Sequence, residues 1–125
     1  MRLVQLLKSK IHHAHITYAN ADYVGSLEVD SDLLDCVGLL PGEHVHVWNI
    51  ENGERFETYV IPGEPGSGVI GLNGAAAIKG KSGDRLIIAA FTLTDEPITP
   101  KMALVDKNNH FVRYLEAWDR ELKED

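Results

Sequence analysis

Residues 44–61 read HVHVWNIENGERFETYVI, and this stretch decides the class of fold. Its first five residues alternate between a polar or amphipathic side chain and valine, which is the period of a β-strand with one buried face. Asn52-Gly53 is a strong signal for a tight hairpin turn. Residues 55–61 are therefore predicted to return as a second, antiparallel strand.

Further short strands are predicted after this hairpin in the sequence. Residues 85–93 (RLIIAAFTL) are nearly continuously apolar, as in a strand that is buried on both faces. Residues 102–105 and 110–114 are separated by the turn-forming residues 106–109 (DKNN) and predict a late hairpin. Many short strands between turn signals predict a mainly β fold, a small barrel or a sandwich.

Helices are predicted to be few and short. Asp30 can cap a helix over residues 31–37, and Gly38 can take the left-handed position after its end. Residues 73–77 predict one helical turn, and residues 116–125 predict a helical or frayed tail. A length of 125 residues fits one domain, and we expect residues 1–125 to form it.

Composition and charge exclude several classes of function. Apolar residues make up 44% and charged residues 25% of the chain, as in soluble domains. No apolar run approaches the ~18–20 residues of a membrane span, and the first residues do not form a signal peptide, so a cytoplasmic protein without a membrane partner is expected. The net charge of −7 argues against nucleic acid as a partner. An acidic ligand would need a local cationic pocket.

The histidines offer a possible metal site, which the spacing does not favour. On a regular strand His13 and His15 would share one face, with His12 on the other, and His44 and His46 would share a face. Zinc sites favour three or four ligands in recognisable spacings, and no HExxH motif is present. Solvated or hydrogen-bonded strand histidines are the better interpretation, and we expect no metal.

Gly25-Ser26 is a weak signal by itself, because Gly66-Ser67 also occurs and either dipeptide would ordinarily form a turn. The surrounding motifs change this interpretation. Residues 23–26 (YVGS) occur together with several other short motifs. These are KIH at 10–12, WN at 48–49, NGERF at 52–56, TY at 58–59 and NGAAA at 73–77. Over about residues 1–93, this set resembles the pyruvoyl-dependent aspartate decarboxylases.

The resemblance implies a six-stranded double-psi β-barrel with short helices, assembled as a homotetramer with active sites between subunits. It implies self-cleavage between Gly25 and Ser26 into chains 1–25 and 26–125, the larger capped by a pyruvoyl group derived from Ser26. The implied reaction converts L-aspartate to β-alanine and CO₂, by way of a Schiff base, for pantothenate and coenzyme A biosynthesis. Neither pyridoxal phosphate nor a metal is implied.

The resemblance also implies roles in self-cleavage. The Ser26 hydroxyl attacks the Gly25 carbonyl, and glycine can adopt the strained backbone that presents this carbonyl. Thr58 is implied to polarise the same carbonyl, although an ordinary strand threonine is its plain interpretation. Arg55 and Tyr59 share strand parity whereas Thr58 points the other way, so either a bulge re-aims Thr58 or the residues act on neighbouring sites.

For the substrate, Tyr59 is implied to return a proton to the α-carbon, and its plain interpretation is a buried aromatic. Arg55 is the candidate for a bidentate grip on a carboxylate, or else a solvated hairpin arginine. Lys10 adds a second positive charge. The implied substrate-binding set is Lys10, Arg55, Thr58, Asn73, Gly74, Ala75 and Ala76.

Two other functions compete with this interpretation. A pyridoxal-phosphate decarboxylase would need a phosphate cradle and a longer chain. A non-enzymatic double-psi barrel that serves as a binding module would need neither Gly25-Ser26 nor the residues at 55, 58 and 59. For the enzyme, we expect residues 24–27 in an exposed or strained loop near Tyr59, Thr58 and the 73–76 turn, with Arg55 and Lys10 farther away.

Overall fold

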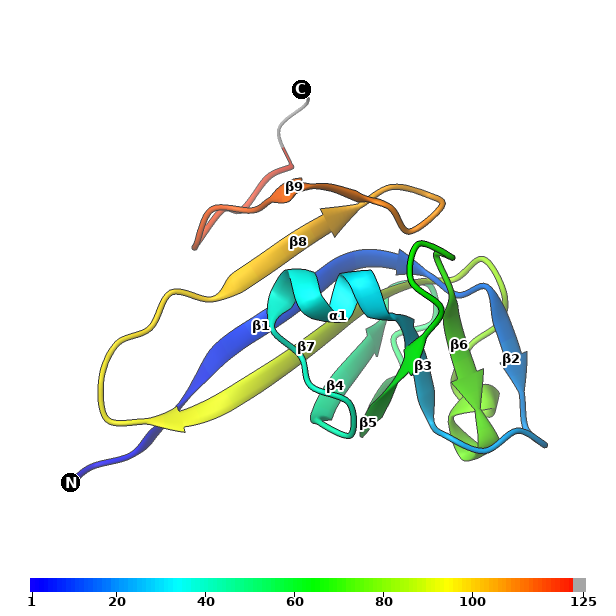
Figure 1. The fold of residues 1–125 in the computed structure, drawn as a ribbon, viewed down its shortest axis with the longest axis horizontal. Helices are drawn as coiled ribbons and strands as arrows, with labels where there is room; N and C mark the ends of the chain where they lie inside the picture. The colour runs from blue at the N-terminus through cyan, green and yellow to red at the C-terminus, as the bar shows by residue number, and fades with distance from the viewer. Residues whose placement is uncertain (123–125) are drawn as a thin grey trace.

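The computed structural model describes residues 1–122, which form nine strands, one α-helix and one 3-10 helix (Figure 1). This confirms the mainly β prediction. The elements are β1 (Val4–His15), β2 (Tyr18–Asn20), β3 (Leu27–Asp30), α1 (Ser31–Val37), β4 (His44–Asn49), β5 (Arg55–Gly63), β6 (Ile70–Asn73), η1 (Gly74–Lys79), β7 (Arg85–Thr94), β8 (Lys101–Val105) and β9 (Phe111–Tyr114).

The strands pair in the order β2-β6-β3-β5-β4-β7-β1-β8-β9. Most neighbours are antiparallel, but β3 runs parallel to β5, β2 to β6, and β1 to β8. The described residues contain more strands than the six predicted, because the short β2 and the C-terminal hairpin of β8 and β9 pair onto the same sheet. Parallel pairs between strands that are not consecutive require crossing connections, so distant segments of the chain meet at β3.

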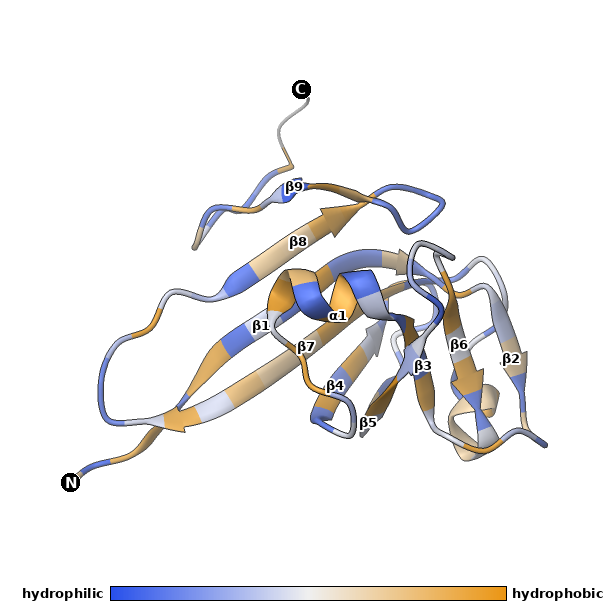
Figure 2. Ribbon diagram, viewed as in Figure 1, coloured by the Kyte–Doolittle hydropathy of each residue, from blue (hydrophilic) through white to orange (hydrophobic). Residues whose placement is uncertain are grey.

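The predicted central hairpin is present. Strands β4 and β5 pair from His44 opposite Tyr59 to Trp48 opposite Arg55 without a bulge. The two valines of β4 are fully buried, and Figure 2 shows the alternation of hydrophilic and hydrophobic residues along this strand. Because the pairing is regular, alternate side chains of both strands lie on one outer face.

Strand β7 forms a long antiparallel pair with β1, and together they extend beyond the rest of the sheet towards the N-terminus (Figure 1). The prediction that this apolar strand is buried on both faces holds at residues 88–90 but is wrong at its end. Leu93 is 65% exposed, since it lies in the extended part of the pair.

The capped helix α1 also agrees with the prediction. Asp30 accepts a hydrogen bond from the Asp32 amide at 2.9 Å, and Gly38 has a left-handed φ of +73°. The buried Asp30 carboxylate accepts two further bonds, from the amides of Gly66 and Gly68. One carboxylate thus caps the helix and fixes the 64–69 loop beside it.

Of the two alternatives for the tail, the helix is absent from residues 116–122, which are irregular with a turn at residues 117–118. Residues 123–125 lie outside the described residues. One prediction about local structure was wrong. Strand β1 carries a bulge between His12 and Ala14, with His13 at a φ of +68°. Because the bulge breaks the two-residue period, the rings of His12 and His13 stack at 4.1 Å instead of facing opposite sides. No helix in the described part of the chain has the length and apolar character that crossing a bilayer requires.

Candidate active site

The Gly25-Ser26 dipeptide lies in a bend immediately before β3. Gly25 has a φ of +96°, a region that side chains other than glycine rarely adopt. A Cβ atom at this position would lie 2.7 Å from Cδ1 of Ile61. Val24 is 90% exposed, whereas Gly25 and Ser26 are half-buried. The expectation of an exposed and strained loop is therefore confirmed at Val24 and Gly25.

Asn73, the last residue of β6, holds both carbonyl groups of this dipeptide. Its side-chain Nδ2 donates a 2.5 Å hydrogen bond to the Gly25 carbonyl. Its backbone N–H donates to the Ser26 carbonyl at 3.0 Å. Asn73 is itself buried, and Leu72 before it pairs with Leu27 in the ladder between β6 and β3. The bond to Gly25 polarises the carbonyl whose carbon Ser26 would attack.

Strand β5 approaches the same dipeptide from the other side of β3. The parallel ladder begins with Leu27 opposite Val60. Thr58 and Tyr59 precede Val60 on β5 as Gly25 and Ser26 precede Leu27 on β3. If the register continued backward from this pair, Thr58 and Tyr59 would lie at the edge of the sheet that carries Gly25 and Ser26. A site formed within one chain stays a prediction.

Thr58 and Tyr59 lie on opposite faces of β5. The ladder between β4 and β5 has no bulge that could re-aim Thr58. Thr58 is half-buried on the side of Val60, while Tyr59 is 44% exposed on the outer face. The first explanation for their opposite directions, a bulge that re-aims Thr58, is therefore excluded. The second, that the residues act on neighbouring sites, remains. The interpretation of Tyr59 as a buried aromatic is also wrong.

The turn after Asn73 packs against the cleavage bend. Gly74 begins η1 with a φ of +62°, and a Cβ atom there would lie 3.5 Å from the carbonyl oxygen of Tyr23. Ala75 is exposed and Ala76 is buried. The small residues of this turn thus let its backbone lie close to the residues that precede Ser26.

The two candidate cations lie elsewhere. The Arg55 guanidinium carbon is 4.5 Å from the centroid of the Trp48 ring, a cation–π contact on the outer face. Arg55 lies four positions before Tyr59, which at ~3.3 Å per residue is about 13 Å along the strand. Lys10 lies on β1, which β5, β4 and β7 separate from β3 in the sheet. Partial burial lowers the pKa of Lys10.

Two residues near the site carried no signal in the sequence. The Tyr18 hydroxyl donates a 2.6 Å bond to Oε1 of Glu28, and burial together with this bond raises the pKa of Tyr18 to about 12. The Tyr18 ring occupies the space that a side chain at Gly71 would need. Because β2 pairs with β6 and β6 with β3, this contact braces the strand that ends at Asn73.

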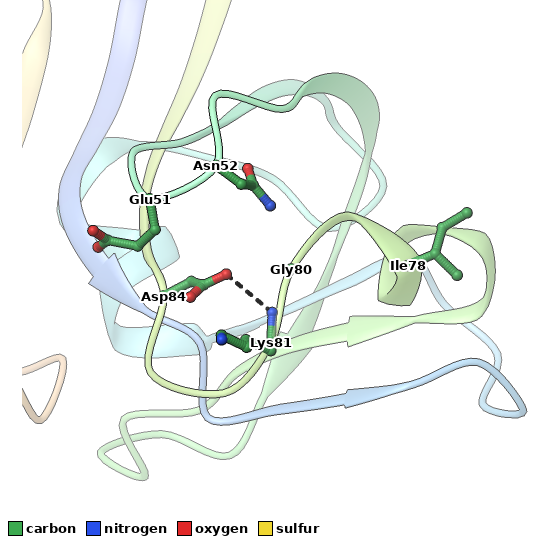
Figure 3. A pocket seen from close by; sticks show the side chains of 6 residues that line it. All are labelled: Glu51, Asn52, Ile78, Gly80, Lys81 and Asp84. Atoms are coloured by element: carbon green, nitrogen blue, oxygen red, sulfur yellow. Dashed lines mark hydrogen bonds between the residues drawn. The ribbon is translucent and has the colours of Figure 1, made fainter.

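A separate hollow lies beside η1 and contains none of the predicted site residues (Figure 3). Its buried Asp84 carboxylate accepts bonds from the Lys81 amide at 3.1 Å and from Nδ2 of Asn49 at 3.0 Å. The first bond closes the turn between η1 and β7, and the second joins that turn to the end of β4. A carboxylate with these partners has a structural role.

Comparison with known proteins agrees with the geometry. The sequence profile of the family described as aspartate decarboxylase matches residues 2–112. The chain is 53% identical over 115 residues to the aspartate 1-decarboxylase of Caldicellulosiruptor saccharolyticus, covering 89% of this chain and 90% of that protein. It is 50% identical over 114 residues to the Geobacillus sp. enzyme of the same name, with coverages of 88% and 90%. For the Burkholderia vietnamiensis enzyme, identity is 49% over 109 residues, with coverages of 83% and 85%. The chain belongs to the aspartate decarboxylase family.

Proposed function

We propose that this chain is the precursor of an enzyme that cuts itself between Gly25 and Ser26 and then converts L-aspartate to β-alanine and CO₂. Membership of a pyruvoyl-dependent family supports the reaction. The observation that carries the proposal for this chain is the bond from Asn73 to the Gly25 carbonyl, at a glycine of positive φ. β-Alanine would serve pantothenate and coenzyme A synthesis.

Self-cleavage begins with attack of the Ser26 Oγ on the Gly25 carbonyl carbon. The peptide C–N bond breaks, the Ser26 nitrogen takes up a proton, and an ester joins the two residues. Negative charge that develops on the carbonyl oxygen is stabilised by Nδ2 of Asn73, which already donates to it. The resemblance assigns the Thr58 hydroxyl as a second donor. Elimination then releases the Gly25 carboxylate, and addition of water with loss of ammonia leaves a pyruvoyl group at position 26.

The residues around Ser26 fit this group. The Ser26 carbonyl would become the amide carbonyl next to the new ketone, and it already accepts the Asn73 N–H at 3.0 Å. Once formed, the ketone supplies an electron-accepting carbonyl for decarboxylation. Half-burial of position 26 limits access of water to it.

The remaining tasks fall to this chain's own side chains. The Tyr59 phenol is protonated at neutral pH and supplies the proton that replaces the lost carboxyl group. Arg55 presents two parallel N–H groups to a substrate carboxylate. Asn73, Gly74, Ala75 and Ala76 line the cleavage bend and form the floor of the substrate site.

Arg55 lies about 13 Å along β5 from Tyr59, and three strands separate the strand of Lys10 from β3 in the sheet order. We infer that a second copy of the chain supplies Arg55 and Lys10. The family resemblance implies a homotetramer, which would provide such a copy. The exposed outer face of β4 and β5, which carries Arg55 and Tyr59, supports such an assembly. We also propose that the sheet closes into a six-stranded double-psi barrel. We propose a cytoplasmic location as well. The parallel pairing of β3 with β5 inside an otherwise mostly antiparallel sheet supports the barrel.

An assay of L-aspartate decarboxylation tests the function directly. Purified protein should form β-alanine and CO₂ in equal amounts, and the matched Ser26→Ala variant should form neither. A binding module would retain the fold and form no β-alanine in either case. β-Alanine formation by Ser26→Ala would instead refute the role of Ser26.

A further inference from the structure

Three potential metal ligands meet on the outer face of the β4–β5 hairpin. The Nε2 atom of His44 lies 2.8 Å from Oε1 of Glu57, and Nε2 of His46 lies 3.6 Å from the same oxygen. The ligand atoms of all three residues lie within 4.8 Å of one another. The three residues share this face with Arg55 and Tyr59, but none of them has a role in the reaction proposed above.

The backbone holds these residues in register. His46 lies directly opposite Glu57 in the ladder, and His44 lies two residues before His46 on the same face of β4. Strand β4 is paired on both sides, with β5 and with β7, so its ends cannot shift independently. The arrangement of the three side chains therefore follows from regular sheet geometry.

Packing also orients the central imidazole. The His46 ring meets Phe91 of β7 edge to face, with centroids 5.3 Å apart and an interplanar angle of 86°. The His46 side chain is 31% exposed, and its Nε2 faces the carboxylate. His44 stands 5.3 Å from it, ring to ring, and is open to solvent. One ligand is thus preoriented, and the other two can adjust to an ion.

We propose that His44, His46 and Glu57 bind a divalent transition-metal ion of the zinc type through two imidazole nitrogens and one carboxylate oxygen. Imidazole and carboxylate are the ligands that such ions prefer. Metal–ligand bonds of ~2.0–2.2 Å in a tetrahedron place ligand atoms roughly 3.3–3.6 Å apart. The observed separations from Glu57 are 2.8 and 3.6 Å, and all three ligand atoms lie within 4.8 Å of one another, so side-chain rotation can bring them into this range.

The alternative is that these groups only form hydrogen bonds. Exposed pairs of this kind contribute little to stability because water competes for both partners. A hydrogen bond would explain why His44 lies close to Glu57. It would not explain why Nε2 of His46 also faces the same carboxylate oxygen. With three protein ligands, a fourth coordination position is left for a water molecule or for a group on a second copy of the chain.

Titration of Zn²⁺ alone into purified, tag-free protein by isothermal calorimetry tests the proposal. One ion should bind per chain. His44→Gln, His46→Gln and Glu57→Gln should each weaken binding by more than the ~10–100-fold that loss of an outer-sphere partner costs. His110→Gln removes an exposed histidine outside the cluster and should leave binding unchanged. Circular dichroism checks that each variant is folded.

Cobalt provides a second, spectroscopic measurement. Co²⁺ bound to the cluster should give visible d–d absorption that Zn²⁺ displaces and that His46→Gln abolishes. A variant that carries all three substitutions and still binds zinc as tightly as the unaltered protein would overturn the proposal. So would equal loss of affinity in His110→Gln and His46→Gln, because binding would then be nonspecific. Neither result depends on self-cleavage or on decarboxylation.

Discussion

Asn73 donates from its side chain to the Gly25 carbonyl, and its backbone N–H donates to the next carbonyl along the chain. One buried residue therefore holds the carbonyl groups of two successive peptide units, one before and one after the α-carbon of Ser26. The side-chain bond reaches the oxygen on which charge would develop during attack by Ser26. Resemblance alone assigned Asn73 to the substrate, whereas its contacts support a role in cleavage first.

Asn73→Ala should slow self-cleavage by about 10²–10³-fold, the cost of removing one donor to a developing oxyanion. The fraction of uncut chain, followed by gel electrophoresis after refolding or new synthesis, measures the rate. Asn108→Ala, in the exposed turn between β8 and β9, is the matched control and should cut normally. Cleavage of a folded Asn73→Ala variant at the normal rate would show that Thr58 suffices as donor.

Gly25→Ala should fold less stably and cut more slowly. The φ of +96° disfavours any Cβ atom by roughly 1–2 kcal/mol, and the new methyl group meets Ile61 at 2.7 Å. Adding Ile61→Val should recover part of the stability in urea titration, because it removes the clash but not the backbone strain. If the single variant matches the unaltered protein in both stability and cleavage, the left-handed conformation is not required.

Much of the fold could be predicted because its signals are local. The Asn52-Gly53 turn and the alternation before it define the central hairpin, and Asp30 with Gly38 define the helix ends. The bulge at His13 was not predictable, since the alternation rule assumes an uninterrupted strand. At the site, the bond between Tyr18 and Glu28 depends on β6 lying between their strands. No local pattern encodes that pairing.

Tyr59→Phe should spare self-cleavage and reduce turnover by roughly 10²–10⁴-fold, the usual contribution of a general acid. Only the phenolic proton is lost, and the ring is already partly exposed, so the fold should persist. Chain masses and the kcat for β-alanine formation separate the two steps. An uncut Phe variant would instead assign Tyr59 to maturation.

Arg55→Lys should lower kcat/KM for L-aspartate by at least about tenfold, or ~1.4 kcal/mol, although the charge is kept. An ammonium group cannot make the two parallel bonds of a guanidinium, and it stacks less well on Trp48. Steady-state kinetics with cleaved enzyme measure the loss. Normal kinetics in this variant would leave Arg55 as a surface cation bound to an aromatic ring.

Stability should fall as the pH is lowered from 6.5 towards 4. Burial, with help from His13 and other nearby cations, lowers the pKa of His12 to about 4. The unfolded chain, with an ordinary histidine pKa of 6.5, therefore binds the proton first, and acid favours unfolding. His13 acts in the same direction. Urea titrations at pH 7 and pH 5 should show a smaller difference for His12→Gln than for His110→Gln.

Intact-mass spectrometry of fully matured protein tests the central claim most directly. Self-cleavage predicts two chains, residues 1–25 and 26–125, with the larger carrying the mass of a pyruvoyl group in place of Ser26 and resisting N-terminal sequencing. Ser26→Ala should give one mass, that of the uncut chain. An unbroken chain from the unaltered protein, or a larger fragment that begins with a free serine, would contradict the account.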